Sequence, residues 1–139
     1  MSETHHLKIQ SDPKHLADGR RFIEQHAKAA GFDDLTVSQI VLAVDEAVTN
    51  IMRYSYEMKP GCDIEFTVTR SKDHLIVALR DYGKPCDPAT IRPRPLHEIR
   101  PGGLGTHFIR TVMDEVKYNC KEPGTELIMV KKRTAPKTA

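Results

Sequence analysis

Apolar and polar positions follow two different periods along the chain. In residues 62–70 and 73–81 they alternate with a period of two, which predicts two strands joined by a short polar turn and ending at Asp81. In residues 33–57 apolar side chains recur at helical spacing, which predicts a long helix with one face in the core. The apolar stripe of this helix consists of Leu35, Ile40, Val41, Val44, Val48 and Ile51.

The remaining segments carry shorter signals of the same kinds. Residues 12–31 begin with Asp12 as a helix cap and Pro13 in the first turn, and they end at Gly31, so both ends of a helix are marked. Further predicted elements are a strand at 6–10, a short helix at 104–113, and strands at 115–120 and 125–132. Together these elements predict an α+β fold, a two-layer α/β sandwich in which helices cover one face of a mixed, mainly antiparallel sheet.

The overall composition narrows the possible function classes. The chain of 139 residues suffices for one domain, and its 21 Lys and Arg residues nearly balance 19 Asp and Glu residues, with the surplus in the last residues. Neither nucleic acid nor a membrane is therefore an expected partner. Because no run approaches about eighteen apolar residues and no signal-peptide core is visible, we expect a cytoplasmic protein. The three cysteines suggest neither a disulfide framework nor a zinc site.

A glycine cluster follows a proline-rich loop. Five prolines interrupt residues 83–101 and exclude a regular element there, and Gly102, Gly103 and Gly105 come next, at the start of a predicted helix. Free backbone N–H groups and the positive end of the helix dipole meet at such a position, so a phosphate could approach closely. Taken alone, the glycines fit equally well with a flexible hinge at the start of the helix. The segment matches neither a Walker loop nor a dinucleotide fingerprint.

Two further patterns could take part in binding a nucleotide. Glu46 and Asn50 lie four positions apart on the long predicted helix, where a carboxylate and an amide oxygen on one face could hold Mg²⁺. Asp81, at the end of a strand, could accept a hydrogen bond from an exocyclic amino group such as that of adenine, and Gly83 would let a flat base approach. For each pattern alone, a solvated helix face or an ordinary turn is the simpler alternative.

The order and spacing of these patterns resemble a known family. The segments DEAVTN, DYGKPCDP, GGLGTHFIRTVMDEVKY and GTELIMVKK resemble the N, G1, G2 and G3 boxes of the GHKL ATPases, which include gyrase, histidine kinases and MutL. More narrowly, nearly the whole chain resembles the small anti-sigma-factor serine kinases, the RsbW-like switch proteins. This resemblance implies the Bergerat fold, Mg²⁺-dependent phosphoryl transfer from ATP to a serine of an anti-anti-sigma (STAS-domain) partner, binding of a sigma factor, and a homodimer.

The resemblance also implies a role for each matched residue. Asn50 would bind Mg²⁺, and Glu46 would polarise the attacking hydroxyl or water. Asp81 would accept from the adenine amino group, with Gly83 beneath the base and the hydroxyl of Thr125 in the same network. Backbone amides of the glycine segment would cradle the phosphates, and its nucleotide-binding residues are Gly102, Gly103, Leu104, Gly105 and Thr106.

The resemblance further suggests how the chain is organised. The proline-rich stretch at about 84–101 would form an ATP lid within a single ATP-binding domain of residues 1–133, followed by a flexible tail at 134–139. Arg53 and Tyr54 depart from the pattern of many kinase members, and so does Cys86 in the lid. The sequence therefore predicts an ATP- and Mg²⁺-dependent serine protein kinase that acts as an anti-sigma factor. The alternative is a non-catalytic, ATP-gated partner-switch module of the same fold.

Overall fold

The computed structural model describes residues 2–83 and 103–133, and of residues 103–106 it describes the backbone alone. The predicted ATP lid at 84–101, Gly102 and the tail at 134–139 lie outside the described residues. What the sequence suggests for these segments therefore stays a prediction.

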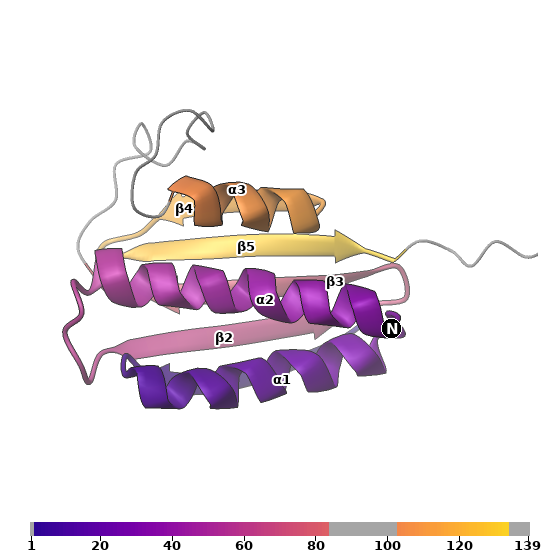
Figure 1. Ribbon diagram of the computed structural model, residues 1–139, viewed down its shortest axis with the longest axis horizontal. Helices are drawn as coiled ribbons and strands as arrows, with labels where there is room; N and C mark the ends of the chain where they lie inside the picture. The colour runs from indigo at the N-terminus through magenta and orange to yellow at the C-terminus, as the bar shows by residue number, and fades with distance from the viewer. Residues whose placement is uncertain (1, 84–102, 134–139) are drawn as a thin grey trace, which may run out of the picture.

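Five strands of the described chain form one sheet (Figure 1). Their order across the sheet is β1-β2-β3-β5-β4, and every neighbouring pair is antiparallel. The strands are β1 (Glu3–Gln10), β2 (Asp63–Arg70), β3 (His74–Asp81), β4 (Glu115–Cys120) and β5 (Thr125–Lys132). The β2–β3 hairpin therefore lies in the middle of the chain, and β3 is also the central strand of the sheet.

Helices of the described chain lie side by side on one face of this sheet (Figure 1). They are α1 (Leu16–Ala29), α2 (Asp34–Asn50) and α3 (Gly103–Val112), with a 3₁₀ turn at Pro13–His15 before α1 and a π-helical turn at Ile51–Ser55 after α2. The central helix α2 contacts both α1 and α3. The predicted α+β fold, with helices on one face of the sheet, is confirmed, although the described sheet is wholly antiparallel instead of mixed.

The ends of the elements differ in detail from the predictions. Asp12 accepts a hydrogen bond from the backbone N–H of Lys14 at 3.0 Å, but the turn that it caps is 3₁₀, and α1 proper begins at Leu16. Strand β1 begins at Glu3, earlier than predicted, because it pairs with the whole length of β2. Such differences arise because pairing partners, rather than local propensity, decide where a strand ends.

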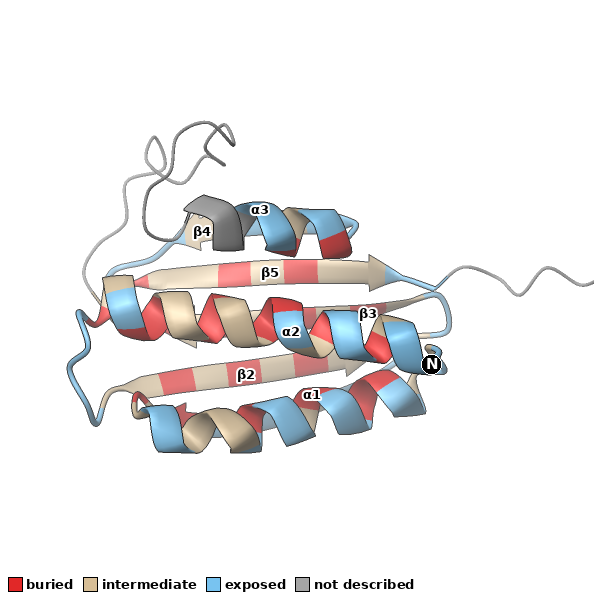
Figure 2. Ribbon diagram, in the orientation of Figure 1, coloured by how far each residue is buried: buried red, intermediate tan, exposed pale blue. Residues whose placement is uncertain are grey.

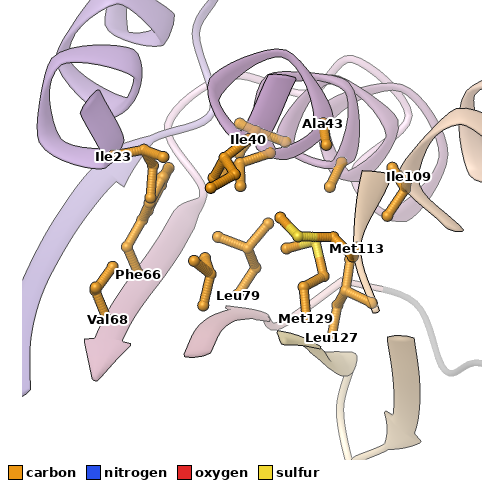
Figure 3. Close-up of a cluster of buried hydrophobic side chains, with 14 of the residues drawn as sticks. Ile23, Ile40, Ala43, Phe66, Val68, Leu79, Ile109, Met113, Leu127 and Met129 are labelled. Atoms are coloured by element: carbon orange, nitrogen blue, oxygen red, sulfur yellow. The ribbon is translucent and has the colours of Figure 1, made fainter. Parts of the chain in front are cut away.

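Apolar side chains from both layers meet in one core (Figure 3). Phe66 of β2 and Leu79 of β3 pack beneath the helices together with Ile40 of α2 and Ile109 of α3, and all four side chains are at most 1% exposed. Helix α1 lies so close to β2 that a Cβ atom at Gly19 would be 2.9 Å from the Phe66 ring. Figure 2 shows the result, with buried residues on the inner sides of the helices and exposed residues on their outer sides.

The segment Asp34–Ser55 is long and apolar enough by composition to cross a membrane. It is not an uninterrupted apolar run, since charged residues such as Asp45 and Glu46 lie within it. In the structure 44% of its most apolar window is buried. Because this helix packs on the sheet between two other helices, core packing accounts for its hydrophobicity.

The two cysteines among the described residues differ in their redox state. Cys62 is a free thiol, whereas Cys120 is disulfide-bonded. The spacing of the three cysteines in the sequence suggests no disulfide framework, and it did not indicate this bond. A disulfide requires two Cβ atoms to lie close together in space, and the spacing of cysteines along a sequence does not reveal that.

Replacing Phe66 by alanine tests the packing of α1 and α2 on the sheet. We expect Phe66→Ala to lower the free energy of unfolding by about 3–5 kcal/mol, because it removes a fully buried ring and leaves a cavity. Urea denaturation measures this change. The matched control is Thr67→Ala on the same strand, whose side chain points to the opposite face and should change stability by about 0.5 kcal/mol or less. Equal effects of the two substitutions would contradict this account of the core.

Candidate functional site

The residues singled out in the sequence gather at one end of the two layers (Figure 1). Helix α2 ends at Asn50, β3 ends at Asp81, β5 begins at Thr125 and α3 begins at Gly103. Asp81 and Thr125 are direct partners in the ladder between β3 and β5. The fold thus brings the segments that resemble the N, G1 and G3 boxes close to the start of α3, which carries the segment that resembles the G2 box.

The carboxylate of Asp81 is the most buried acidic group at this end. Asp81 is 2% exposed, and its Oδ1 accepts a hydrogen bond from the backbone N–H of Gly83 at 3.0 Å. Its Oδ2 accepts a longer bond from the hydroxyl of Ser55 at 3.4 Å, and the backbone of Thr125 also donates to the carboxylate. Burial nevertheless raises the pKa of Asp81, and the hydrogen bonds only partly oppose this shift. The carboxylate is therefore a fixed acceptor in a site shielded from water.

Two glycines allow the backbone to close around Asp81. A Cβ atom at Gly83 would collide with the backbone carbonyl of Ser55, so this glycine is required by the close approach of two chain segments. Room for a flat base, the reason suggested by the sequence, stays a prediction. Gly124 has φ +85°, and a Cβ atom there would collide with the backbone carbonyl of Asp81. In the sequence Gly124 opens the segment GTELIMVKK, directly before Thr125, and only the structure shows its contact with Asp81.

The π-helical turn at Ile51–Ser55 was not foreseen in the sequence. The backbone N–H of Tyr56 donates to the carbonyl of Ile51 at 3.0 Å and closes the turn. The Tyr56 hydroxyl donates to the carbonyl of Asp63 at 2.5 Å and accepts from the N–H of Tyr82 at 2.7 Å. Burial raises the pKa of Tyr56 to about 12, so the hydroxyl keeps its proton. This side chain ties the turn to the ends of two strands.

Polar atoms without partners lie at the end of α2. The Oδ1 atom of Asn50 and the hydroxyl of Tyr54 are buried and form no hydrogen bond with the described part of the chain. Buried polar atoms of folded proteins nearly always have a partner, so a ligand bound at this end could satisfy these two atoms. An amide oxygen with a free lone pair fits a hard cation such as Mg²⁺. Tyr54 was noted in the sequence as a departure from the family pattern, and only the structure shows that its hydroxyl is unsatisfied.

Glu46 lies one helical turn before Asn50. It is partly exposed and forms no hydrogen bond or ion pair with the described residues. The neighbouring Asp45 instead bonds to Arg20 of α1 at 3.1 Å. Of these two adjacent carboxylates, Glu46 is therefore the one without a bonded partner in the described part of the chain.

The glycine segment forms the first turn of α3. Gly103, Leu104, Gly105 and Thr106 lie in this turn, and their side chains are not described. Backbone N–H groups of a first helical turn have no partner within the helix, which suits an anion. Gly102 lies outside the described residues, and His107 is exposed.

Comparison with known proteins agrees with this arrangement. The family described as histidine kinase-like ATPase domain matches residues 9–131. The chain belongs to this family. Among curated relatives, the serine-protein kinase RsbW of Listeria monocytogenes is 30% identical over 133 residues, which span 90% of this chain and 84% of the relative. The serine-protein kinase RsbW of Oceanobacillus iheyensis is 26% identical over the same shares of both chains. Within the family, the chain thus belongs to the RsbW-like members.

Solved structures show the same fold at low sequence identity. The RsbU and RsbW domains of Rv1364c from Mycobacterium tuberculosis match 96% of this chain with a TM-score of 0.67 and 14% identity. This chain covers 33% of that longer protein. The mycobacterial sensor histidine kinase MprB matches 92% of this chain and 97% of its own, with a TM-score of 0.57 and 15% identity. The layers described above are therefore those of known RsbW and histidine kinase domains.

The contact between Gly124 and Asp81 predicts a large effect of one methyl group. Gly124→Ala should lower the free energy of unfolding by about 1–3 kcal/mol more than Gly61→Ala does, because only the former introduces a collision. Gly61 is the matched control, since it has a similar φ of +79° but no atom within 4 Å of the position that a Cβ atom would occupy. Its own cost should be about 1–2 kcal/mol from the left-handed conformation. Thermal and urea unfolding of both variants measure the difference, and equal costs would contradict the contact.

The burial of Asp81 predicts how stability depends on pH. Because the folded state raises the pKa of this acid, the protonated form is favoured by folding, and that contribution is lost as the pH rises through the folded pKa. We expect the unfolding free energy of the natural chain, minus that of Asp81→Asn, to fall as the pH rises from about 4 to 7. Urea unfolding at several pH values measures this. Asp73→Asn, in the exposed β2–β3 turn, shows the effect of removing an acid elsewhere, and a difference for Asp81→Asn that rises with pH would contradict the assignment.

Proposed function

We propose that this protein is an ATP- and Mg²⁺-dependent serine protein kinase that acts as an anti-sigma factor in the cytoplasm. Its relatives are serine-protein kinases, and its domain is that of histidine kinase-like ATPases. The observation that carries the proposal is the buried Oδ1 atom of Asn50, which has no partner in the described part of the chain and lies one helical turn from the carboxylate of Glu46. Such a pair suits a metal–nucleotide complex and a proton acceptor beside it.

The base of ATP would bind at the end of β3. Asp81 would accept a hydrogen bond from the adenine amino group, with Gly83 and Thr125 beside it. Support for this role comes from the burial of the carboxylate and from the backbone donors that orient it. A buried acceptor rejects a base that presents an acceptor at the same place, since two acceptors would be left unpaired. Asp81 would therefore favour adenine over guanine.

The phosphates would lie between α2 and the start of α3. Backbone amides of the segment Gly102, Gly103, Leu104, Gly105 and Thr106 would bind them, and the lid at 84–101 would cover them. Asn50 would be the protein ligand of Mg²⁺, whose charge offsets that of the phosphates during transfer. No group of three or more His, Cys, Asp or Glu side chains suited to a metal occurs in the described part of the chain. The nucleotide itself would thus supply further oxygen ligands.

Glu46 would act on the serine of the partner protein. Its carboxylate would take the proton of the serine hydroxyl as the serine oxygen bonds to the γ-phosphorus. The bond between the γ-phosphorus and the bridging oxygen then breaks, and ADP leaves. The partner would be an anti-anti-sigma protein with a STAS domain, and a sigma factor would be the protein released or bound in turn. We further propose a homodimer, with residues 1–133 as one ATP-binding domain.

A second candidate is a non-catalytic module that binds ATP and holds its partner without phosphorylating it. The observation that favours it lies just after Asn50, where the Arg53 guanidinium lies 5.7 Å from the centre of the Tyr54 ring. Both residues depart from the pattern of many kinase members. They alter the surroundings of the reacting groups, while nucleotide binding by Asp81 and Asn50 would persist.

Phosphate transfer decides between these candidates. Purified protein is incubated with γ-labelled ATP, Mg²⁺ and each purified anti-anti-sigma protein of the same genome. We expect label on a serine of one of them, and a loss of at least about 100-fold in the rate with Glu46→Gln because the proton acceptor is gone. Asp45→Asn is the matched control, since this neighbouring carboxylate bonds to Arg20 and should leave most of the transfer intact.

Nucleotide binding is measured on the same variants. ATP and Mg²⁺ should raise the melting temperature of the natural chain and of Glu46→Gln alike, and Asn50→Ala should lose the part that requires Mg²⁺. Transfer by Glu46→Gln at the natural rate would refute its role. Binding of ATP without label on any partner would favour the non-catalytic module, and no binding would refute both candidates.

A further inference from the structure

The outer face of α2 differs from an ordinary solvated helix face. Its exposed residues after Asp34 are Leu35, Ser38, Gln39 and Leu42, and none of them is charged. Leu35 is 69% exposed and Leu42 is 56% exposed. These leucines are seven positions apart and so lie on one side of the helix. The uncharged face therefore extends over about two turns and presents two large apolar side chains to solvent.

The adjacent helix α1 provides a direct comparison within the same layer. Its exposed face carries charged residues that pair with one another, with Arg21 bound to Asp18 and Lys28 bound to Glu24. Both helices lie on the same side of the sheet, so both would meet the same solvent (Figure 2). Depletion of charge together with exposed apolar anchors is typical of the centre of a protein interface. By this criterion the outer face of α2 resembles an interface, whereas that of α1 resembles an ordinary solvated surface.

The uncharged face of α2 leads directly to the candidate site of phosphoryl transfer. Glu46 follows Leu42 by four positions and so projects from the same side of the helix, about one turn further along. On the other flank, Phe108 of α3 is 37% exposed, and α3 packs beside α2. A protein that brings a serine to Glu46 must cover the adjoining surface. Leu42 is the nearest exposed apolar residue on that side of α2 within the described chain.

We propose that the outer face of α2, from Leu35 to Leu42, is the docking surface for the protein that carries the phosphoacceptor serine. This proposal rests on the kinase function proposed above. The partner would present an uncharged, mainly apolar surface within about one helical turn of its serine, with Leu42 as the central contact. Docking there would place the serine hydroxyl beside the carboxylate of Glu46 without any contact with the adenine site around Asp81.

The test measures binding of purified anti-anti-sigma proteins from the same genome in the presence of a non-hydrolysable ATP analogue and Mg²⁺. Leu42→Lys should weaken binding of the cognate partner at least about tenfold and raise its KM in phosphate transfer, because the charge would be buried in the complex. The affinity for ATP should stay within about twofold. The control Gln25→Lys places the same charge on the exposed face of α1, and it should bind the partner within about twofold of the natural chain.

A conservative variant separates loss of docking from loss of folding. Leu42→Met keeps an apolar side chain and should retain partner binding, and all variants should melt within a few degrees of the natural chain. If Leu42→Lys binds the partner and transfers phosphate as well as the natural chain does, the docking surface is refuted and the kinase function stands. If the natural chain binds ATP but none of the candidate partners, the proposed docking and the proposed kinase function are both refuted.

Discussion

The burial of one carboxylate constrains the whole end of the molecule at which the candidate site lies. Asp81 is the last residue of β3, and its side chain is buried instead of facing solvent. A buried acid must find donors, and the donors here are the backbone groups of Gly83 and Thr125 and the hydroxyl of Ser55. These segments can come so close only because Gly83 and Gly124 have no side chain. The glycines near Asp81 are therefore requirements of the fold as well as of a ligand site.

One side of helix α2 packs in the core, and the opposite side borders the candidate site. Its inner side carries Ile40, Val44 and Val48 into the core, and Glu46 lies on its more exposed side, at the edge of the candidate site. The π-helical turn that follows lets the chain leave the helix with Ser55 against β3. Single π turns are rare and occur often at functional sites. Here the turn connects the side chains expected to bind the metal with those expected to bind the base.

Several groups of the candidate site lower the stability of the folded state, and packing elsewhere has to offset this loss. Burial opposes the ionisation of Asp81, and two polar atoms at the end of α2 have no partner among the described residues. A bound nucleotide with its metal would satisfy these atoms, so binding would also raise the stability of the folded state. The large apolar core beneath α2, formed by residues of both layers, supplies the stability that makes such unsatisfied groups tolerable.

Much of this protein was determined by its sequence alone. The period of two in β2 and β3, the helical stripe of α2 and the cap at Asp12 depend on local spacing, so they could be predicted, and so could the family. The tertiary structure decided the π-helical turn, the left-handed Gly124 against Asp81, the disulfide state of Cys120 and the unsatisfied hydroxyl of Tyr54. Each of these depends on which distant segments come into contact. Such contacts are set by the burial of the whole core and have no local signature in the chain.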